Sequence, residues 1–325
     1  MRKRSTMATF FSASLALAMA WSSVVHAQAY PSKPIRLLVG YAAGGGADVL
    51  ARILTAKLTD TLGQPITVDN RPGAGGTLAA GILAKAPADG YTLYFSDASL
   101  VTAPAIFAQL PFDPIASFSP VAGVASLPLA FVTHPAVPVD SPKAFLALIQ
   151  ANPDKHSYGT PGVGTLHHLS IELLKKQAGL AIQHIPYKGA APLINDLMGG
   201  QIGIGVTSAT AALAQVKGGK LRIVGLTSRE RVASAPDVPT IAEALPGYEV
   251  TNGLFVLAPA GTPSAIVATL GKALKTVLEA KAMQESYLAQ GAIIEWSSAE
   301  DLATRIGRDV ARWKSVAKDA GIRPE

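Results

Sequence analysis

Ile35-Arg36-Leu37-Leu38-Val39-Gly40-Tyr41-Ala42-Ala43-Gly44-Gly45-Gly46-Ala47-Asp48 is the stretch that decides the fold. Its first five residues form an apolar, β-rich run, and after the glycines apolar residues recur at helical spacing as far as Leu62. A glycine-rich turn between a strand and a helix leaves backbone N–H groups free at the helix start, where partial positive charge collects. We therefore predict an anion pocket at 41–48 built from backbone. The alternative is a plain turn in which the glycines only ease the bend.

Two phosphate-binding motifs fail in this sequence. The dinucleotide fingerprint G-x-G-x-x-G needs a glycine where Val49 stands. A P-loop needs Ser or Thr after Gly-Lys, and Leu221 and Ala273 follow the two Gly-Lys pairs. These absences argue against nucleotide binding, and a carboxylate is the simpler anion.

The N-terminus has the pattern of a secretory signal peptide. Arg2, Lys3 and Arg4 precede an apolar segment over 8–21, and small residues suited to cleavage follow at 25–29. We predict a signal peptide over 1–27; a retained membrane anchor is the alternative. The 325 residues contain no cysteine, which excludes disulfides, a thiol nucleophile and a lipid-modified cysteine anchor. We expect a soluble protein exported to the periplasm.

The charge of the chain argues against nucleic acid as a partner. The formal net charge is +6, and removal of Arg2, Lys3 and Arg4 with the signal leaves +3. The mature sequence contains no run of basic residues and no alternation of basic and aromatic residues of the kind that binds nucleic acid. About 300 mature residues are enough for two domains.

Strand and helix patterns alternate from Pro34 onward, which predicts an α/β fold with parallel sheets covered by helices. The alternation pauses at two proline-rich segments, one around 121–132 and one at 235–263. Two such crossings bracket a middle domain and predict two lobes joined by two strands, able to close like a hinge. We assign 28–130 and 255–325 to lobe 1 and 131–254 to lobe 2. Helix caps are predicted at Thr262-Pro263 and at Ser297, which has Glu300 at capping-box spacing.

Small residues and hydroxyls follow six predicted strands. These junctions are 41–48, 71–77, 96–97, 160–165, 186–189 and 207–210. In open α/β sheets, ligands bind beyond the carboxyl ends of the strands. Six such loops from two lobes predict one cleft, although hydroxyls also cap helices where no ligand binds.

Motifs of catalysis are missing. H-E-x-x-H and G-x-S-x-G do not occur, and no nucleophile has its base nearby in the pattern. His168 and Glu172 are four residues apart, a spacing that suits an ordinary helix-surface pair better than a metal site. Lys188 fits a contact to a bound anion or a solvated charge better than a Schiff-base amine. We therefore predict no catalytic residue, no metal and no cofactor.

Ordered motifs along the mature chain match a known family. They are Tyr30-Pro31-Ser32-Lys33-Pro34-Ile35, Ala42-Ala43-Gly44-Gly45-Gly46, Asp69-Asn70-Arg71-Pro72-Gly73-Ala74-Gly75-Gly76, Ala88-Asp89-Gly90-Tyr91-Thr92-Leu93, His184-Ile185-Pro186-Tyr187-Lys188-Gly189, Asp196-Leu197-Met198-Gly199-Gly200-Gln201, Asp237-Val238-Pro239-Thr240 and Ala258-Pro259-Ala260-Gly261-Thr262-Pro263. The chain resembles the Bug family, the extracytoplasmic receptors of tripartite tricarboxylate transporters.

The resemblance implies a two-lobed type II periplasmic binding protein fold with a two-strand hinge. It implies a receptor, not an enzyme, that captures a small carboxylate between the lobes and delivers it to inner-membrane permease subunits. A monomer is the default expectation. The ligand-binding residues that it implies are Tyr41, Ala42, Ala43, Gly44, Gly45, Gly46, Ala47, Asp48, Ser96, Asp97, Thr160, Gly162, Gly164, Thr165, Thr207, Ser208 and Ala209.

Two positions depart from the family pattern. Gly203 stands where relatives often carry aspartate, and Ala47 where they commonly carry threonine. If both face the cleft, the site is roomier and suits a bulkier ligand such as an aromatic dicarboxylate; otherwise they have no effect on ligand size. Two other functions stay open: an exported enzyme acting on an acid through His168 or Lys188, and a sensory receptor for a membrane kinase.

Overall fold

The structure is a computed structural model that describes residues 30–44, 46–153, 155–187 and 189–324. The chain divides into two units, Met1–Ser32 and Lys33–Glu325. The predicted signal peptide, Gly45 and Lys188 lie outside the described residues. Among the described helices, none combines the length and the apolar character needed to span a membrane.

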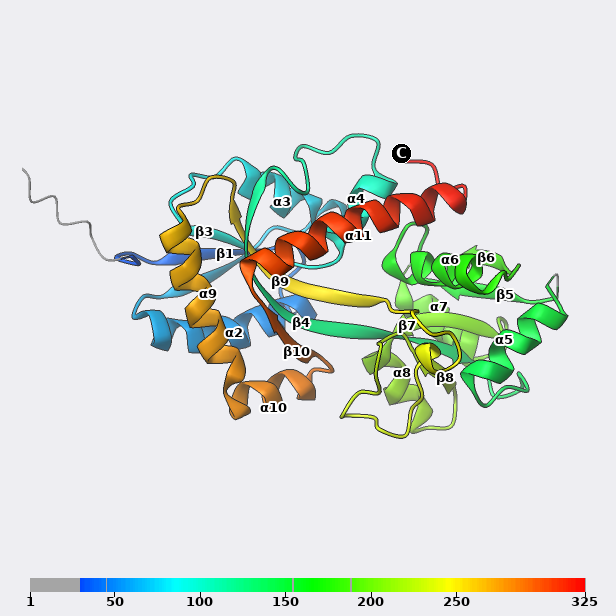
Figure 1. The fold of residues 1–325 in the computed structure, drawn as a ribbon. Coiled ribbons are helices and arrows are strands. Elements are labelled where there is room, and N and C mark those ends of the chain that lie inside the picture. The colour runs from blue at the N-terminus through cyan, green and yellow to red at the C-terminus, as the bar shows by residue number, and fades with distance from the viewer. Residues whose placement is uncertain (1–29, 45, 154, 188, 325) are drawn as a thin grey trace, which may run out of the picture. The chain divides into compact units, whose positions relative to one another are not determined.

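The strands of the second unit form one mixed sheet (Figure 1). Three parallel strands lie at one end in the order β2-β1-β3: β1 (Ile35–Val39), β2 (Ile66–Asn70) and β3 (Thr92–Ser96). Three more parallel strands lie at the other end in the order β7-β5-β6: β5 (Ser157–Thr160), β6 (Gln183–Pro186) and β7 (Ile204–Ser208). Two long antiparallel strands, β4 (Phe118–Thr133) and β9 (Thr251–Pro259), run between the two groups. The predicted α/β class is confirmed, but the strands are parallel only within each group.

Strand β4 belongs to both groups. Its first part pairs with β9 and β10 (Ile293–Ser297), and its last five residues, from Leu129, pair with β7. β8 (Arg222–Leu226) pairs with the same end of β4. The sequence pattern showed only a pause here, because residues 121–126 are buried on both faces and no alternation can appear. Prolines 120 and 128 also argue against a central strand, and a register shift beside Pro120 accommodates one of them.

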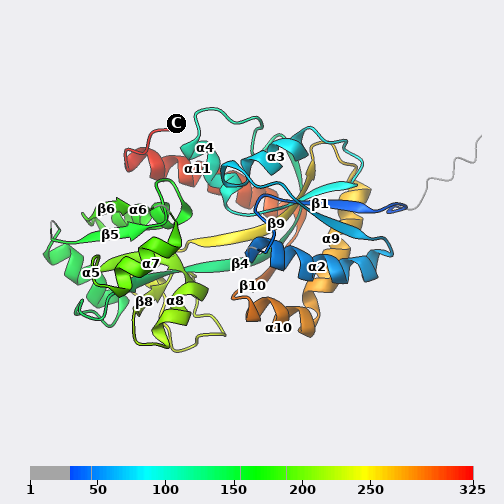
Figure 2. The ribbon, with the colours of Figure 1, turned by 180° about the vertical axis from the view of Figure 1, so that it is seen from behind.

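The helices lie beside these strands in two sets, which Figure 2 shows from behind. With the β1–β3 group lie α2 (Gly46–Leu62), α3 (Thr77–Ala84), α4 (Ser99–Ile106), α9 (Ser264–Glu279) and α10 (Lys281–Ala289). With the β5–β7 group lie α5 (Pro142–Ala151), α6 (Leu166–Ala178), α7 (Ala190–Met198) and α8 (Ala209–Val216).

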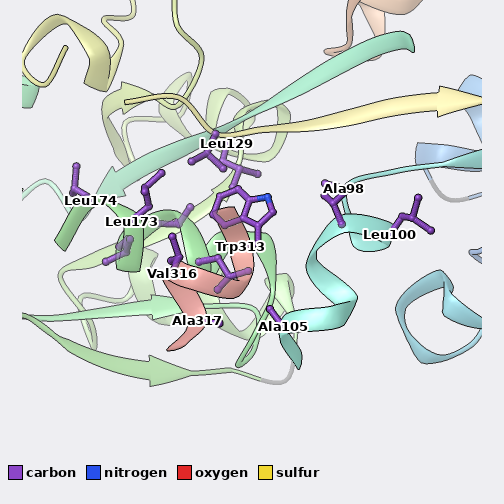
Figure 3. Packing of buried hydrophobic residues seen from close by; sticks show 14 of the residues in the cluster. Ala98, Leu100, Ala105, Leu129, Leu173, Leu174, Trp313, Val316 and Ala317 are labelled. Atoms are coloured by element: carbon purple, nitrogen blue, oxygen red, sulfur yellow. The ribbon is translucent and has the colours of Figure 1, made fainter. Parts of the chain in front are cut away.

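The last helix, α11 (Ala299–Asp319), contacts α4, β4 and α6 and so belongs to neither set alone. Figure 3 shows Trp313, Val316 and Ala317 of α11 in one buried cluster with Leu129 of β4 and Leu173 of α6. The apolar residues that recur at helical spacing along this helix are buried: Leu302, Ile306, Val310, Trp313 and Ala317. One continuous core therefore holds both strand groups along the crossing.

Both predicted helix caps were wrong. Ser298, not Ser297, caps α11, and its hydroxyl accepts a hydrogen bond from the Asp301 N–H at 3.1 Å. The residues one position later have the same spacing, so the motif could not distinguish them. Thr262 turns back to donate to the Pro259 carbonyl at 2.8 Å, and Pro263 precedes α9 without a side-chain cap.

Candidate functional site

The loops predicted to form a cleft leave the sheet at two edges. Loops 41–48, 71–77 and 96–97 follow the parallel strands β1, β2 and β3. Loops 160–165, 186–189 (without Lys188, which lies outside the described residues) and 207–210 follow β5, β6 and β7. Because parallel strands end at a common edge, each set of loops is gathered by its own sheet segment.

Asn252 of β9 connects the loop after β3 to the long strands β4 and β9 that run between the two strand groups. Its Oδ1 accepts a hydrogen bond from the Ala98 N–H at 3.0 Å, and its Nδ2 lies 3.5 Å from Asp97 Oδ2. Asn252 pairs with Leu127 of β4, and Leu129, two residues further, pairs with Ser208 at the end of β7. A strand rises ~3.3 Å per residue, so Asn252, whose side chain contacts Asp97, and Ser208 are offset by about 7 Å along β4.

Asp48 shapes the first loop from inside. The residue is 2 % exposed, and its carboxylate accepts hydrogen bonds from the Gly44 N–H at 2.8 Å, Arg52 Nε at 2.9 Å and Asn70 Nδ2 at 2.9 Å. The hydrogen bond from Arg52 is the largest influence, and it lowers the pKa of Asp48 to about 2. The carboxylate is therefore used within the loop, while Ala42, Ala43, Gly44 and Gly46 are exposed and Ala47 is half-buried.

Tyr41 and Asp97, both predicted site residues, contact each other directly. The Tyr41 hydroxyl donates to Asp97 Oδ2 at 2.7 Å, and the Ser99 N–H donates to Oδ1 at 3.0 Å. Burial, followed by the charge of Asp97, raises the pKa of Tyr41 far above its usual value, so the hydroxyl stays protonated. Asn70 Nδ2 donates to the Tyr41 carbonyl at 3.0 Å and so ties this pair to the Asp48 loop.

Thr160, Gly162, Gly164 and Thr165 lie together in one turn. The Thr165 hydroxyl donates to the Gly162 carbonyl at 2.9 Å and accepts from the His168 N–H at 3.3 Å, which caps α6. The Gly164 N–H donates to His168 Nδ1 at 3.1 Å.

A buried cluster supports that turn from below. The rings of His168 and His184 stack with centroids 3.8 Å apart, and His184 Nε2 lies 2.6 Å from Thr160 Oγ1. Burial lowers the pKa of each histidine to about 4, so both rings are neutral at pH 7. Glu172 accepts from the Tyr158 hydroxyl at 2.6 Å and from Lys175 Nζ at 2.8 Å. The interpretation of His168 and Glu172 as a surface pair was therefore wrong, since both are buried.

Among the described residues, no group of three or more His, Asp or Glu side chains is arranged to hold a metal ion. The contacts that the His168–His184–Glu172 cluster makes beneath the 160–165 loop are ring stacking and hydrogen bonds.

The end of β7 contributes Thr207, Ser208 and Ala209. Ser208 caps α8, its hydroxyl accepting from the Ala211 N–H at 3.2 Å. Thr207 Oγ1, like Ser96 Oγ at the end of β3, is buried without a hydrogen-bond partner among the described residues. The 160–165 loop also packs against the end of α4: a Cβ placed on Gly164 would lie 2.8 Å from Ile106 Cδ1.

Gly203 does not line this region. It directly precedes β7, opposite the end that carries Ser208, and a Cβ there would lie 3.1 Å from Val137 Cγ2. Five residues of extended chain separate it from Ser208 by about 16 Å. The position of Gly203 favours the alternative in which it has no effect on ligand size, whereas Ala47 adjoins the first loop in the first turn of α2.

Two surface hollows lie elsewhere. One of about 440 Å³ runs between β9 and α11 and is lined by Glu249, Arg305 and Arg312 among others. One of about 670 Å³ lies beside Trp296 and α9. Neither is lined by a predicted site residue.

Sequence reasoning missed two side chains that organise the loops. Asn70 lies in the 69–76 motif, and its hydrogen bonds to Tyr41 and Asp48 give that motif a structural role. Asn252 shows only as a polar residue at the start of an apolar strand, and its partner Asp97 is 155 residues away.

Comparison with known proteins identifies the family. Residues 50–322 match the family model TctC, described as the tripartite tricarboxylate transporter family receptor. Protein BugT of Bordetella pertussis is 35% identical over 302 residues, covering 92% of this chain and 93% of BugT. An R. palustris protein solved with adipate is 33% identical, with a TM-score of 0.76 over 91% of this chain and 100% of the other.

MatC of Rhodopseudomonas palustris, solved with bound malate, is 30% identical, with a TM-score of 0.71 over 89% of this chain and 100% of MatC. The chain belongs to the TctC, or Bug, family of solute-binding receptors and has their two-lobed periplasmic binding protein fold with a two-strand hinge.

Proposed function

We propose that this chain is a periplasmic receptor that binds a small carboxylate between two lobes and presents it to the permease subunits of a tripartite transporter. The proposed lobes are 28–130 with 255–325, and 131–254. The observation that carries the proposal is the position of Asn252, which contacts Asp97 and Ala98 after β3 and lies only two residues of strand register from Ser208 at the end of β7. Adipate and malate in two related proteins support a carboxylate as the ligand class.

The site would hold an anion mainly through backbone groups. Helices α2, α6 and α8 all begin at the gathered loops, at Gly46, Leu166 and Ala209. A helix N-terminus favours an anion by ~0.3–2 kcal/mol, whereas micromolar affinity needs about 8 kcal/mol. One loop is insufficient, so we infer that both loop sets enclose the ligand and exclude water.

Asp97 has a positioning role in this proposal. Its two oxygens are occupied by Tyr41, Ser99 and Asn252, so its charge is directed into the protein. Asp97 thereby fixes the Tyr41 hydroxyl and the loop at Ser99 beside the proposed ligand site. Because its oxygens are already hydrogen-bonded, it would not repel a carboxylate ligand as a free carboxylate would.

The test is a calorimetric titration of the mature protein with adipate, malate, aspartate and terephthalate, and with adipamide as the uncharged control. Each acid that binds is then followed by small-angle scattering. We expect saturable, stoichiometric binding of at least one acid, no product and a smaller radius of gyration. Binding without compaction would refute the two-lobe enclosure, turnover would favour an enzyme, and failure of every acid would refute the carboxylate assignment.

A further inference from the structure

Gly291 and Thr210 meet beside the crossing of the sheet. Gly291 lies between α10 and β10, and Thr210 is the second residue of α8. A Cβ placed on Gly291 would lie 3.2 Å from the Thr210 Cβ and closer still to its Oγ1, nearer than real Cβ contacts allow. The backbone at Gly291 is therefore packed against Thr210 with no room for a side chain.

The contact joins the two proposed lobes close to their hinge. Ile293, two residues after Gly291, pairs with Ser126 of β4. Ser208, two residues before Thr210, pairs with Leu129 of the same strand. Gly291 therefore belongs to the proposed lobe 1 and Thr210 to the proposed lobe 2, and both lie close to residues 126–129 of β4.

We propose that the Gly291–Thr210 contact is the stop that sets how far the two lobes close, and that Gly291 determines ligand affinity without touching the ligand. The inference rests on the proposed function, because it needs a receptor whose lobes close on an acid.

Because the Gly291–Thr210 contact lies near the hinge, a small displacement at this contact becomes a larger displacement at the proposed ligand site. Neighbouring strands lie about 4.8 Å apart, so for a rotation about β4 a displacement of ~1 Å at β7 becomes ~2 Å at β5, one strand further out. Strand β5 carries the 160–165 loop. Hydrogen bonds fail when they lengthen well beyond 3.5 Å, so a ~2 Å opening removes the contacts of this loop.

A simpler reason for glycine here must be separated from the stop. Gly291 has φ +74° and ends α10, its N–H donating to the Leu288 carbonyl at 2.9 Å. That conformation favours glycine whether or not a neighbour is close. Gly179 is the matched control: it ends α6 with φ +63°, and nothing lies within 4 Å of a Cβ placed there.

The experiment compares the wild-type protein with Gly291→Ala, Gly179→Ala and the double variants Gly291→Ala/Thr210→Ala and Gly291→Ala/Thr210→Ser. Adipate and malate are the probes in calorimetry, and scattering is measured on each protein with and without them. Urea unfolding shows the backbone cost that the two glycine variants share.

We expect Gly291→Ala to bind about tenfold more weakly or worse, because the closed fraction falls by that factor. Gly179→Ala should lose similar stability but keep the wild-type affinity. Thr210→Ala removes Oγ1 and Cγ2 and should restore most of the affinity of Gly291→Ala, whereas Thr210→Ser keeps a hydroxyl and should restore less.

Equal affinities for the two glycine variants, or no rescue by Thr210→Ala, would overturn the inference. Failure of the wild-type protein to bind any acid would instead refute the proposed function. In that case the ligand-free scattering still decides on the stop: a larger radius of gyration for Gly291→Ala, reversed by Thr210→Ala, supports it, and identical profiles refute it.

Discussion

Replacing Asp48 with asparagine should destabilise the protein through the loop that begins α2. Asp48 accepts hydrogen bonds from Gly44, Arg52 and Asn70 at 2.8–2.9 Å and is 2 % exposed, so water cannot replace the lost contacts. Asparagine retains one acceptor oxygen but brings an amide donor that faces these donors. Hydrogen bonds to a charged group each contribute about 1.5–3 kcal/mol, and partial retention leaves an expected loss of ~2–4 kcal/mol in the free energy of unfolding.

The assay is urea unfolding followed by circular dichroism at pH 7, with Asp60→Asn as the control. Asp60 lies exposed on the same helix, and its substitution should change the free energy of unfolding by less than about 0.5 kcal/mol. Calorimetry with adipate or malate on the same variants then reports whether the loosened 41–48 loop also loses affinity.

The pH dependence gives a second, independent check. The pKa of Asp48 is about 2 in the folded protein and 3.8 ordinarily, so the unfolded chain takes up the proton first as pH falls. The contribution of the carboxylate is therefore fully present above about pH 4 and is lost as pH falls through about 2. The difference in free energy of unfolding between the wild-type protein and Asp48→Asn should stay constant from pH 7 to pH 4 and decrease below pH 4. A gap under ~0.5 kcal/mol at pH 7, or one that does not narrow, would refute this account of the loop.

Two further predictions concern the other parts of the site. Tyr41→Phe removes the donor to Asp97 at 2.7 Å and should lower the free energy of unfolding by about 1–3 kcal/mol in urea; an unchanged midpoint would contradict it. His168 and His184 have lowered pKa values of about 4 against 6.5 ordinarily, so wild-type stability should be full above about pH 6.5 and fall toward pH 4. A flat urea midpoint over that range would show that the two rings do not titrate as buried groups.

Much of the fold follows from local patterns. Glycine-rich turns after apolar strands, helical periodicity and the paired proline-rich pauses predicted the α/β class and the two crossings. Sequence patterns did not identify elements in which apolar and polar residues show no regular periodicity. β4 is buried on both faces and shows no alternation, and α4 is almost wholly apolar and contains Pro104. Both elements contribute residues to the buried core, where burial removes the contrast between apolar and polar positions on which the patterns depend.

By itself the sequence determined the secreted character expected of the chain, its family and the loops in which a ligand site should be sought. Only the tertiary structure decided what those loops do. It turned Asp48 inward onto Gly44 and placed Gly203 at the opposite end of β7 from Ser208. It also joined Asp97 to Asn252 and Gly291 to Thr210. The physical reason is that propensity and periodicity record how each residue meets its chain neighbours and the core. Contacts between segments 80 to 155 residues apart depend instead on strand pairing, which local sequence does not specify.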